Sequence, residues 1–251
     1  MKKQLFFVNY SITDYEKASQ VIIDKALSHS VYCVSALAVH GLIESVQNRS
    51  FRDCLTKIDL IVPDGQPVKW ALNSFYSVGL KDRVAGPILT KHVLSKANKL
   101  RLSIFLYGST LLTLEKLQYH LKTNYPYIRI SGIHADRFRE ATPDEDAEDV
   151  KKINESRADI VLVGRGCPRQ EKWVVDHTEL IQAPLMAVGA AFDFFAGNIK
   201  HAPRWMQTWG LEWFYRLMQD PKKLWKRYLI TNTYFVFLFI TCKLRLYKVA
   251  F

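Results

Sequence analysis

The stretch from Ala158 to Glu171 reads ADIVLVGRGCPRQE, and it decides the fold. Its apolar and largely β-branched run, 160–163, is typical of a buried parallel strand. Gly164 and Gly166 then allow a tight turn and a close approach of the backbone to a ligand. Because Pro168 suits the first turn of a helix, the stretch predicts a strand, a glycine turn and a helix N-terminus. Such a terminus favours an anion, although the same pattern also occurs in plain strand-to-helix turns.

Working outward, strand-like and helix-like segments alternate along the chain. Apolar runs predict strands at 4–8, 31–34, 59–62, 102–107, 128–131, 160–163 and 185–188. Helical spacing or helix-start residues predict helices at 14–27 with Thr13 as its cap, within 35–44, at 68–75, from Gly86, up to about Asn124, and from Thr142. This alternation predicts an α/β fold: a doubly wound, mostly parallel, Rossmann-like sheet.

Length and composition fit one large domain with an appendage. The chain has 251 residues, enough for a full core of this class. Its four cysteines fall at no disulfide or metal-ligand spacing, which fits a reducing cytoplasm. The apolar run at the start is too brief for a signal peptide. We therefore expect an α/β catalytic core over 1–199 and a helical appendage over 200–251.

The charge of the chain is concentrated in this appendage. The net charge is +11, and the residues from Lys200 onward hold ten Lys or Arg against two acidic residues, with four of the six Trp. Fifteen uncharged residues, 228–242, are too few to cross a bilayer, which needs about twenty. Basic residues flank this run: Lys222, Lys223, Lys226 and Arg227 before it, and Lys243, Arg245 and Lys248 after it. The pattern favours a helix lying on an anionic membrane surface, with packing on the core or in a dimer as the alternative.

Four further segments follow the opening stretch in a fixed order. They read GAAFDFFAG at 189–197, APRW at 202–205, GLEWFYRL at 210–217 and PKKLWKR at 221–227. With GRGCPRQE, this series resembles the WecG/TagA/CpsF family of bacterial glycosyltransferases, glycosyltransferase family 26. The resemblance extends over nearly the whole chain, because Pro63-Asp64-Gly65 and the loop that ends in Gly86 also match the family.

The resemblance implies transfer of a sugar from a UDP-sugar to a polyprenyl-diphosphate-linked sugar, with inversion, in bacterial surface polysaccharide synthesis (exopolysaccharide, capsule or teichoic acid). It assigns Asp64 as the base that activates the acceptor hydroxyl, and a base of this kind works best when burial raises its pKa. Arg216 is the second catalytic candidate, for the charge of the leaving diphosphate. The resemblance and the glycine turns together predict a substrate site formed by Ser35, Gly65, Gly86, Gly108, Phe138, Gly166, Gln170, Asp193, Arg204, Lys223 and Lys226.

Two places depart from the family pattern. Where the family usually has Thr-x-Asn, this chain has Ser35 and Leu37, which keeps a hydroxyl and loses an amide. Where the family favours Gly-Tyr-Phe, the chain has Asp136-Arg137-Phe138, so Phe138 is the one ring left there for base stacking. Leu37 therefore hints at a substrate unlike that of the teichoic-acid members.

We expect no metal ion or other cofactor, because we recognise no Asp-x-Asp sequence for a metal-bridged diphosphate. Arg216, Lys223, Lys226 and the helix after Gly166 can supply the positive charge instead. His40 and Glu44 lie one helical turn apart, but a third ligand is not evident, so we interpret them as a surface or core pair. The expected partners are the UDP-sugar, the lipid-linked acceptor and a membrane surface, without nucleic acid, and a homo-oligomer stays open. The expected location is the inner face of the bacterial cytoplasmic membrane.

Two other functional classes stay open at this point. A dinucleotide-dependent oxidoreductase would explain the glycine turn, although Gly164-Arg165-Gly166 lacks a third glycine and lies far from the first strand. A nucleic-acid adaptor would explain the basic appendage. Binding of NAD in place of UDP would indicate the first class, and salt-sensitive nucleic-acid binding without UDP affinity would indicate the second.

Overall fold

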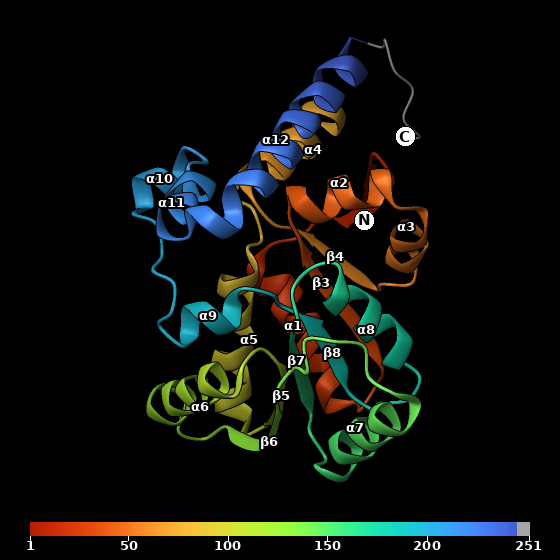
Figure 1. Ribbon diagram of the computed structural model, residues 1–251, viewed down its shortest axis with the longest axis vertical. Helices are drawn as coiled ribbons and strands as arrows, with labels where there is room; N and C mark the ends of the chain where they lie inside the picture. The colour runs from red at the N-terminus through yellow and green to blue at the C-terminus, as the bar shows by residue number, and fades with distance from the viewer. Residues whose placement is uncertain (245–251) are drawn as a thin grey trace.

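The core of the protein is a parallel β-sheet with helices on both faces, as the sequence predicts. The structure is a computed structural model that describes residues 1–244 (Figure 1). Its six-stranded sheet has the order β4-β3-β8-β7-β5-β6, and all neighbouring strands are parallel. The strands are β3 (Tyr32–Leu37), β4 (Leu60–Pro63), β5 (Ser103–Gly108), β6 (Arg129–His134), β7 (Ile160–Gly164) and β8 (Pro184–Ala187).

Two apolar clusters hold the helices against the two faces. Alternate residues of β7 divide between them: Ile160 and Leu162 point into one cluster, and Val161 and Val163 into the other. The first cluster is completed by α1 (Tyr15–Leu27), α5 (Gly86–Leu100), α6 (Leu111–Asn124) and α9 (Ala191–Phe195). The second is completed by α2 (Val39–Gln47), α3 (Arg49–Thr56), α4 (Gln66–Tyr76), α7 (Pro143–Glu155) and α8 (Arg169–His177).

The N-terminal segment differs from its predicted form. The single strand expected at 4–8 is wrong, because the structure has a hairpin of β1 (Lys2–Leu5) and β2 (Val8–Ser11). Phe6 turns the chain with a left-handed φ of 53°, and no Gly or Asn announces this turn. The cap of α1 is also corrected, since Asp14 rather than Thr13 accepts the hydrogen bond from the Lys17 amide.

The order of the strands opens a crevice where the sheet can bind a ligand. From β5 the chain continues to β6 at the edge, whereas from the neighbouring β7 it continues to β8 toward the centre. Ligands of such sheets bind outside the carboxyl ends of strands at this kind of switch point. Gly108 and Gly164 are paired at these two ends, and a Cβ on Gly108 would lie 2.6 Å from the Gly164 carbonyl oxygen. The close approach of the two strands therefore requires glycine at 108.

The appendage forms three helices that lie against the core. They are α10 (Arg204–Thr208), α11 (Glu212–Gln219) and α12 (Pro221–Lys243), and Figure 1 shows α12 running beside α4. Phe235, Leu238 and Cys242 are buried in the same cluster as α2 and the hairpin. The Phe235 ring lies 6.2 Å from that of Phe6, and the Lys243 ammonium donates to the Ser74 carbonyl. One face of α12 thus belongs to the core, which was the alternative to a purely membrane-bound helix.

The opposite face of α12 exposes a second apolar stripe. Its large exposed side chains are Trp225, Leu229, Ile230, Val236, Phe237 and Ile240, and exposed Leu244 follows directly after the helix. Most are spaced by three, four or seven residues, which places them on one side of a helix. Within residues 1–244, no helix is long and apolar enough to cross a bilayer. Arg245 and Lys248, the last two basic residues that flank the apolar run, lie outside the described residues.

Candidate active site

Asp64 lies at the carboxyl end of β4, where the chain turns into α4. Its amide donates to the Leu37 carbonyl on the neighbouring strand at 3.4 Å, and Gly65 makes the turn with a φ of 89°. The half-buried carboxylate accepts a hydrogen bond from the Gly86 amide, at 3.2 Å from Oδ2. Burial raises the pKa of Asp64 to about 6, against the lowering effects of Arg83 and of the Gly86 bond. Asp64, Gly65 and Gly86 therefore come together as predicted, around a carboxyl group suited to proton transfer near neutral pH.

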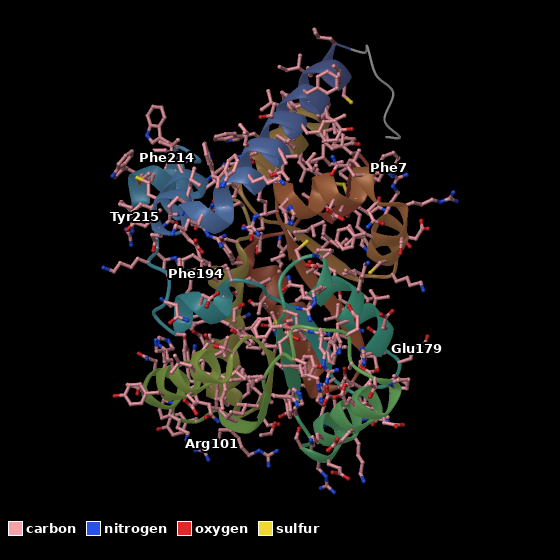
Figure 2. All side chains as sticks on the ribbon, in the orientation of Figure 1. Phe7, Arg101, Glu179, Phe194, Phe214 and Tyr215 are labelled. Carbon is pink, nitrogen blue, oxygen red and sulfur yellow. The ribbon has the colours of Figure 1, made fainter. Side chains whose placement is uncertain are left out.

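The appendage adds charged residues to this carboxylate. Glu212, the first residue of α11, forms an ion pair with Arg83, and their side chains are only 17% and 7% exposed. Arg216 follows one turn later on α11, and its charge lowers the pKa of Asp64. Its guanidinium lies 5.8 Å from the centre of the Phe194 ring, and its buried Nε has no hydrogen-bond partner among the described residues. In Figure 2, Phe194 lies on the same side of the molecule as Phe214 and Tyr215 of α11.

Two further contacts fasten the appendage beside Asp64. The Gln66 amide nitrogen donates to the Gln207 carbonyl at 3.4 Å. Gly210 packs on Trp70 so closely that a Cβ would lie 2.7 Å from the indole ring, and its φ is 73°. The start of α11 is therefore held against α4, directly after the strand that carries Asp64.

A second group of predicted residues is linked through buried hydrogen bonds. The Gly166 amide donates to the Gln170 side chain at 3.2 Å, and Gln170 in turn donates to Glu171 at 2.9 Å. The Ser35 hydroxyl, on β3, donates to the same Glu171 oxygen at 3.0 Å. Burial raises the pKa of Glu171, and its other carboxyl oxygen has no hydrogen-bond partner among the residues described. Ser35, Gly166 and Gln170 thus form one network at the carboxyl ends of β3 and β7.

Asp193 takes a different position, because it faces α6. It is half-buried in α9 and accepts a hydrogen bond from Asn198 at 3.1 Å. Asn198 also donates to Thr113, at the start of α6. Asp193 therefore orders the loop after α9 in this structure and keeps carboxylate lone pairs for a ligand.

The cations around the glycine turn are already paired. Arg165 and Arg169 both bind the carboxylate of Asp136, which follows β6; the Arg169 guanidinium forms two bonds of 2.9 and 3.1 Å. Two guanidinium charges meet one carboxylate, so one net positive charge remains beside the N-terminus of α8. No side chain caps that helix start. Asp136, which departs from the family pattern, therefore positions these two arginines.

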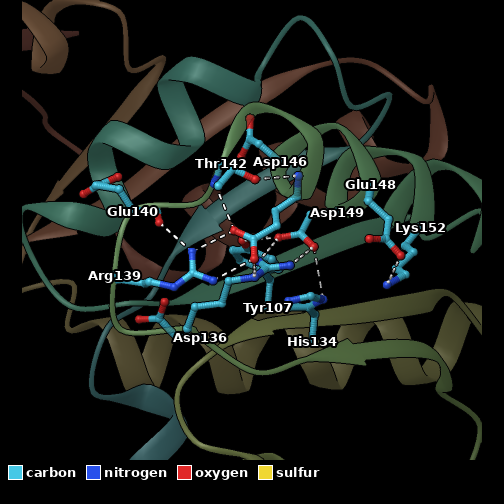
Figure 3. A network of polar contacts seen from close by, with 12 residues as sticks. Tyr107, His134, Asp136, Arg139, Glu140, Thr142, Asp146, Glu148, Asp149 and Lys152 are labelled. Carbon is cyan, nitrogen blue, oxygen red and sulfur yellow. Dashed lines mark hydrogen bonds and ion pairs between the residues drawn. The ribbon is translucent and has the colours of Figure 1, made fainter.

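The loop that carries Phe138 is fastened to α7 (Figure 3). Arg139 binds Glu145 with two bonds of 2.7 Å, and Glu145 completes the capping box with Thr142 that the sequence predicts. Arg137 binds the buried Asp149 next to Tyr107. Phe138 itself is 63% exposed, at the edge of the sheet opposite to Asp64. The structure does not bring Phe138 to the Asp64 cluster.

Three other predicted residues have no described contact with Asp64. Arg204 and Lys226 are exposed, and the side chain of Lys223 lies outside what the structure describes. Sequence reasoning missed Arg83, Glu212 and Glu171, although each lies inside a motif that it quoted. It also missed Arg227, next to Lys226. Arg227 faces His40 and lowers its pKa after the larger effect of burial, and both residues have a buried nitrogen without a hydrogen-bond partner in the described part of the chain.

The described residues offer no site for a metal ion. Residues 1–244 contain no group of three side chains suited to a metal ion. The chain does contain one Asp-x-Asp sequence, Asp144-Glu145-Asp146, which sequence reasoning overlooked. It forms the first turn of α7, where Asp146 binds His177 at 3.0 Å. Its carboxylates therefore act in helix capping and ion pairing.

Comparison with known proteins identifies the family of the chain. The model of the glycosyl transferase WecG/TagA/CpsF family matches residues 3–249. An N-acetylglucosaminyldiphosphoundecaprenol N-acetyl-beta-D-mannosaminyltransferase from Bacillus subtilis is 34% identical over 191 residues, which are 76% of this chain and 72% of that protein. The enzyme of the same name from Bacillus spizizenii is 30% identical over 233 residues, 92% of this chain and 87% of that protein. These matches decide among the three functional classes, and the chain belongs to the WecG/TagA/CpsF family of glycosyl transferases.

Proposed function

We propose that this glycosyltransferase moves a sugar from a UDP-sugar to a sugar on polyprenyl diphosphate, with inversion, at a site between β4 and α11. The observation that carries the proposal is the half-buried Asp64 carboxyl with its raised pKa, beside an Arg216 whose Nε has no partner among the described residues. The names of the relatives support the acceptor class, because they specify an N-acetylglucosaminyl group on diphosphoundecaprenol.

The chemistry follows from these two groups. Asp64 takes the proton of the acceptor hydroxyl while that oxygen attacks the anomeric carbon from the face opposite the leaving group. The bond from the anomeric carbon to the diphosphate breaks, and UDP leaves with the bonding electrons. Arg216 neutralises the growing negative charge, and it needs little reorganisation because α11 already holds it in the site. The proton stays on Asp64 until the product leaves.

We assign the donor nucleotide to the carboxyl ends of β5 and β7, at the switch point of the sheet and on the same edge of the sheet as Asp64. The uncapped start of α8 and the net positive charge of the pair Arg165 and Arg169 favour an anionic diphosphate. We assign Gln170 to the sugar or phosphates and Asp193 to a ribose or base donor group. A metal ion is not needed for this arrangement, because guanidinium groups and amide N–H groups supply the positive charge.

The identity of the donor sugar depends on the contacts at the end of β3. The relatives' names indicate N-acetylmannosamine, whereas Leu37 is buried in the core here and presents no amide to a substrate. A panel of UDP-sugars, with a short-chain N-acetylglucosaminyl diphosphate lipid as the acceptor, decides this point. We expect one donor to give UDP release that depends on the acceptor, with inverted stereochemistry of the product. Release with none of the donors, together with stoichiometric binding of NAD, would contradict the proposed activity.

We also propose that the appendage places the enzyme on the inner face of the cytoplasmic membrane. α12 is apolar on two sides, and the core covers only one of them. A helix of this kind needs a second apolar environment, and a lipid surface offers it. Exposed Trp205, Trp209, Trp213, Phe214 and Met218, on or directly after α10 and α11, add further apolar side chains to the surface of the appendage. A lipid-linked acceptor fits this placement, because it stays in the bilayer.

The membrane role predicts that the double substitution Phe237→Ser and Ile240→Ser weakens binding to anionic phospholipid vesicles by roughly tenfold to a hundredfold. Two large apolar side chains lose burial in lipid, each worth about 1.5–3 kcal/mol when burial is complete. Vesicle co-sedimentation measures the effect. The matched control is Leu112→Ser with Tyr119→Ser, two exposed residues on α6. Equal loss in both variants, or none in the first, would remove this face of α12 from membrane binding.

A further inference from the structure

Four charged side chains of alternating sign meet at the boundary between the core and α11. Asp64 and Arg83 come from the core, and Glu212 and Arg216 from the appendage. Glu212 and Arg216 are four residues apart on α11, so both project from one face of that helix. Among the described residues, the direct ion pair of this cluster joins Arg83 to Glu212. The Arg83 side chain is thereby ion-paired with the appendage, while its charge still acts on Asp64 without a direct ion pair.

The core holds Arg83 close to Asp64 through the backbone. The Val84 amide donates to the Pro63 carbonyl at 2.9 Å, and the Gly86 amide donates to the Asp64 carboxylate. The loop 82–86 is therefore fixed to Pro63, the last residue of β4, and to Asp64, which follows it. Among the carboxylates whose charge acts on Arg83, Asp64 comes next after Glu212, so an Arg83 guanidinium without Glu212 is left to interact with Asp64.

We propose that Glu212 is a positioning residue for the transfer reaction, which keeps Arg83 in an ion pair of its own and so leaves Asp64 a free, basic carboxylate while α11 lies on the core. This inference rests on the proposed role of Asp64 as the base. A carboxylate paired with a guanidinium has a lowered pKa and a weakened basicity. Docking of the appendage then does more than add Arg216, because it also sets the strength of the base.

The effect on Asp64 has a definite sign. Burial is the largest cause of its raised pKa, Glu212 raises it further, and Arg83 and Arg216 lower it. Removal of the Glu212 charge takes away one effect that raises the pKa of Asp64. It also frees the Arg83 guanidinium, which lowers that pKa. The pKa of Asp64 should therefore fall, and the pH below which activity is lost should fall with it.

Other titratable groups near the cluster could also affect the pH dependence of activity and have to be distinguished from Asp64. Tyr10 on β2 and Tyr15 on α1 face Asp64, but their pKa values are raised, so both stay neutral at the pH values of interest. His201 is a further titratable group beside the cluster. It lies close to Glu212, Arg83 and Lys91, stacks on Phe194 at 4.3 Å, and has a pKa lowered by burial. A variant of His201 is therefore a required control.

The test is the pH dependence of kcat and kcat/KM for the full chain with the active UDP-sugar and a short-chain lipid acceptor. Glu212→Gln keeps the size of the side chain and an acceptor for Arg83 but removes the charge. We expect its acid limb to move down by on the order of one pH unit, and kcat on the plateau to fall by up to about tenfold. Glu212→Asp, which restores the charge, should return the limb toward its original position.

Two controls separate this effect from general ones. Glu115→Gln removes one exposed charge on α6, and His201→Asn removes the neighbouring titrating ring; both should leave the acid limb in place. A direct NMR titration of the Asp64 carboxyl in the same proteins measures its pKa without turnover. An unmoved limb and an unmoved carboxyl pKa in Glu212→Gln would reduce Glu212 to an anchor for α11 and overturn the inference. If Asp64→Asn is also fully active, the proposed function fails instead.

Discussion

Replacement of Asp64 by asparagine should lower turnover by roughly two to four orders of magnitude, the usual contribution of a general base. Asparagine keeps the shape of the side chain and can still accept the hydrogen bond from the Gly86 amide, which Asp64 accepts at 3.2 Å. It cannot take a proton from the acceptor hydroxyl. Affinity for UDP should stay within a few-fold of the original, because Asp64 acts on the acceptor. UDP release and equilibrium binding of UDP measure the two quantities.

The pH dependence and the stability of this variant make the test sharper. The pKa of Asp64 is raised to about 6, so the unsubstituted enzyme should lose activity as the pH falls through about 6. A carboxyl whose pKa is raised on folding disfavours the folded state once it is ionised, above that pKa. Asp64→Asn should therefore unfold at an equal or higher temperature at pH 7. Asp82→Asn, in an exposed neighbouring loop, is the matched control. Near-normal turnover in Asp64→Asn would take the base role away from Asp64.

Much of the fold follows from local sequence patterns. The runs 160–163 and 185–188 were predicted as strands, and both lie in the centre of the sheet because they are apolar on both faces. The helix start at Thr142 is a purely local signal and is confirmed, with Thr142 as the N-cap. The hairpin at the N-terminus was missed because its turn uses Phe6 in a left-handed conformation, which few sequence rules anticipate.

The sequence predicted individual residues of the candidate site but not which of them lie close together. Asp64 and Arg216 were recognised from motifs, but their proximity depends on the docking of α11, and their separation of 152 positions in the sequence hides it. Arg83 and Glu212 were overlooked for the same reason, since an ion pair between distant segments leaves no local pattern. The same holds for α12, whose Leu224, Leu238 and Cys242 are buried although the sequence does not distinguish them from its exposed apolar residues. A helix with apolar residues all round is compatible with packing on the core and on lipid alike, and only the structure shows which side the core takes.

Arg216→Ala should lower kcat by about a hundredfold to a thousandfold, the usual cost of losing one group that stabilises transition-state charge in a site of this kind. The structure favours a point substitution over removal of the appendage, because Phe235 and Leu238 of α12 are part of the core cluster and their loss would expose it. Arg216→Lys should recover part of the activity, since an ammonium keeps the charge and lacks the fork of the guanidinium. The exposed Lys222→Ala is the control for loss of one positive charge.

The same variant distinguishes a catalytic role of Arg216 from a role in membrane attachment. One charge contributes only about 1 kcal/mol to attraction by anionic lipid, so Arg216→Ala should reduce vesicle binding only slightly. Its acid limb should move to higher pH, because Arg216 lowers the pKa of Asp64. This shift is opposite in sign to the one expected for Glu212→Gln. Opposite shifts from two residues one turn apart on α11 would show that the appendage acts on the base through its charges. Normal turnover on a soluble acceptor analogue would leave the appendage as an anchor alone.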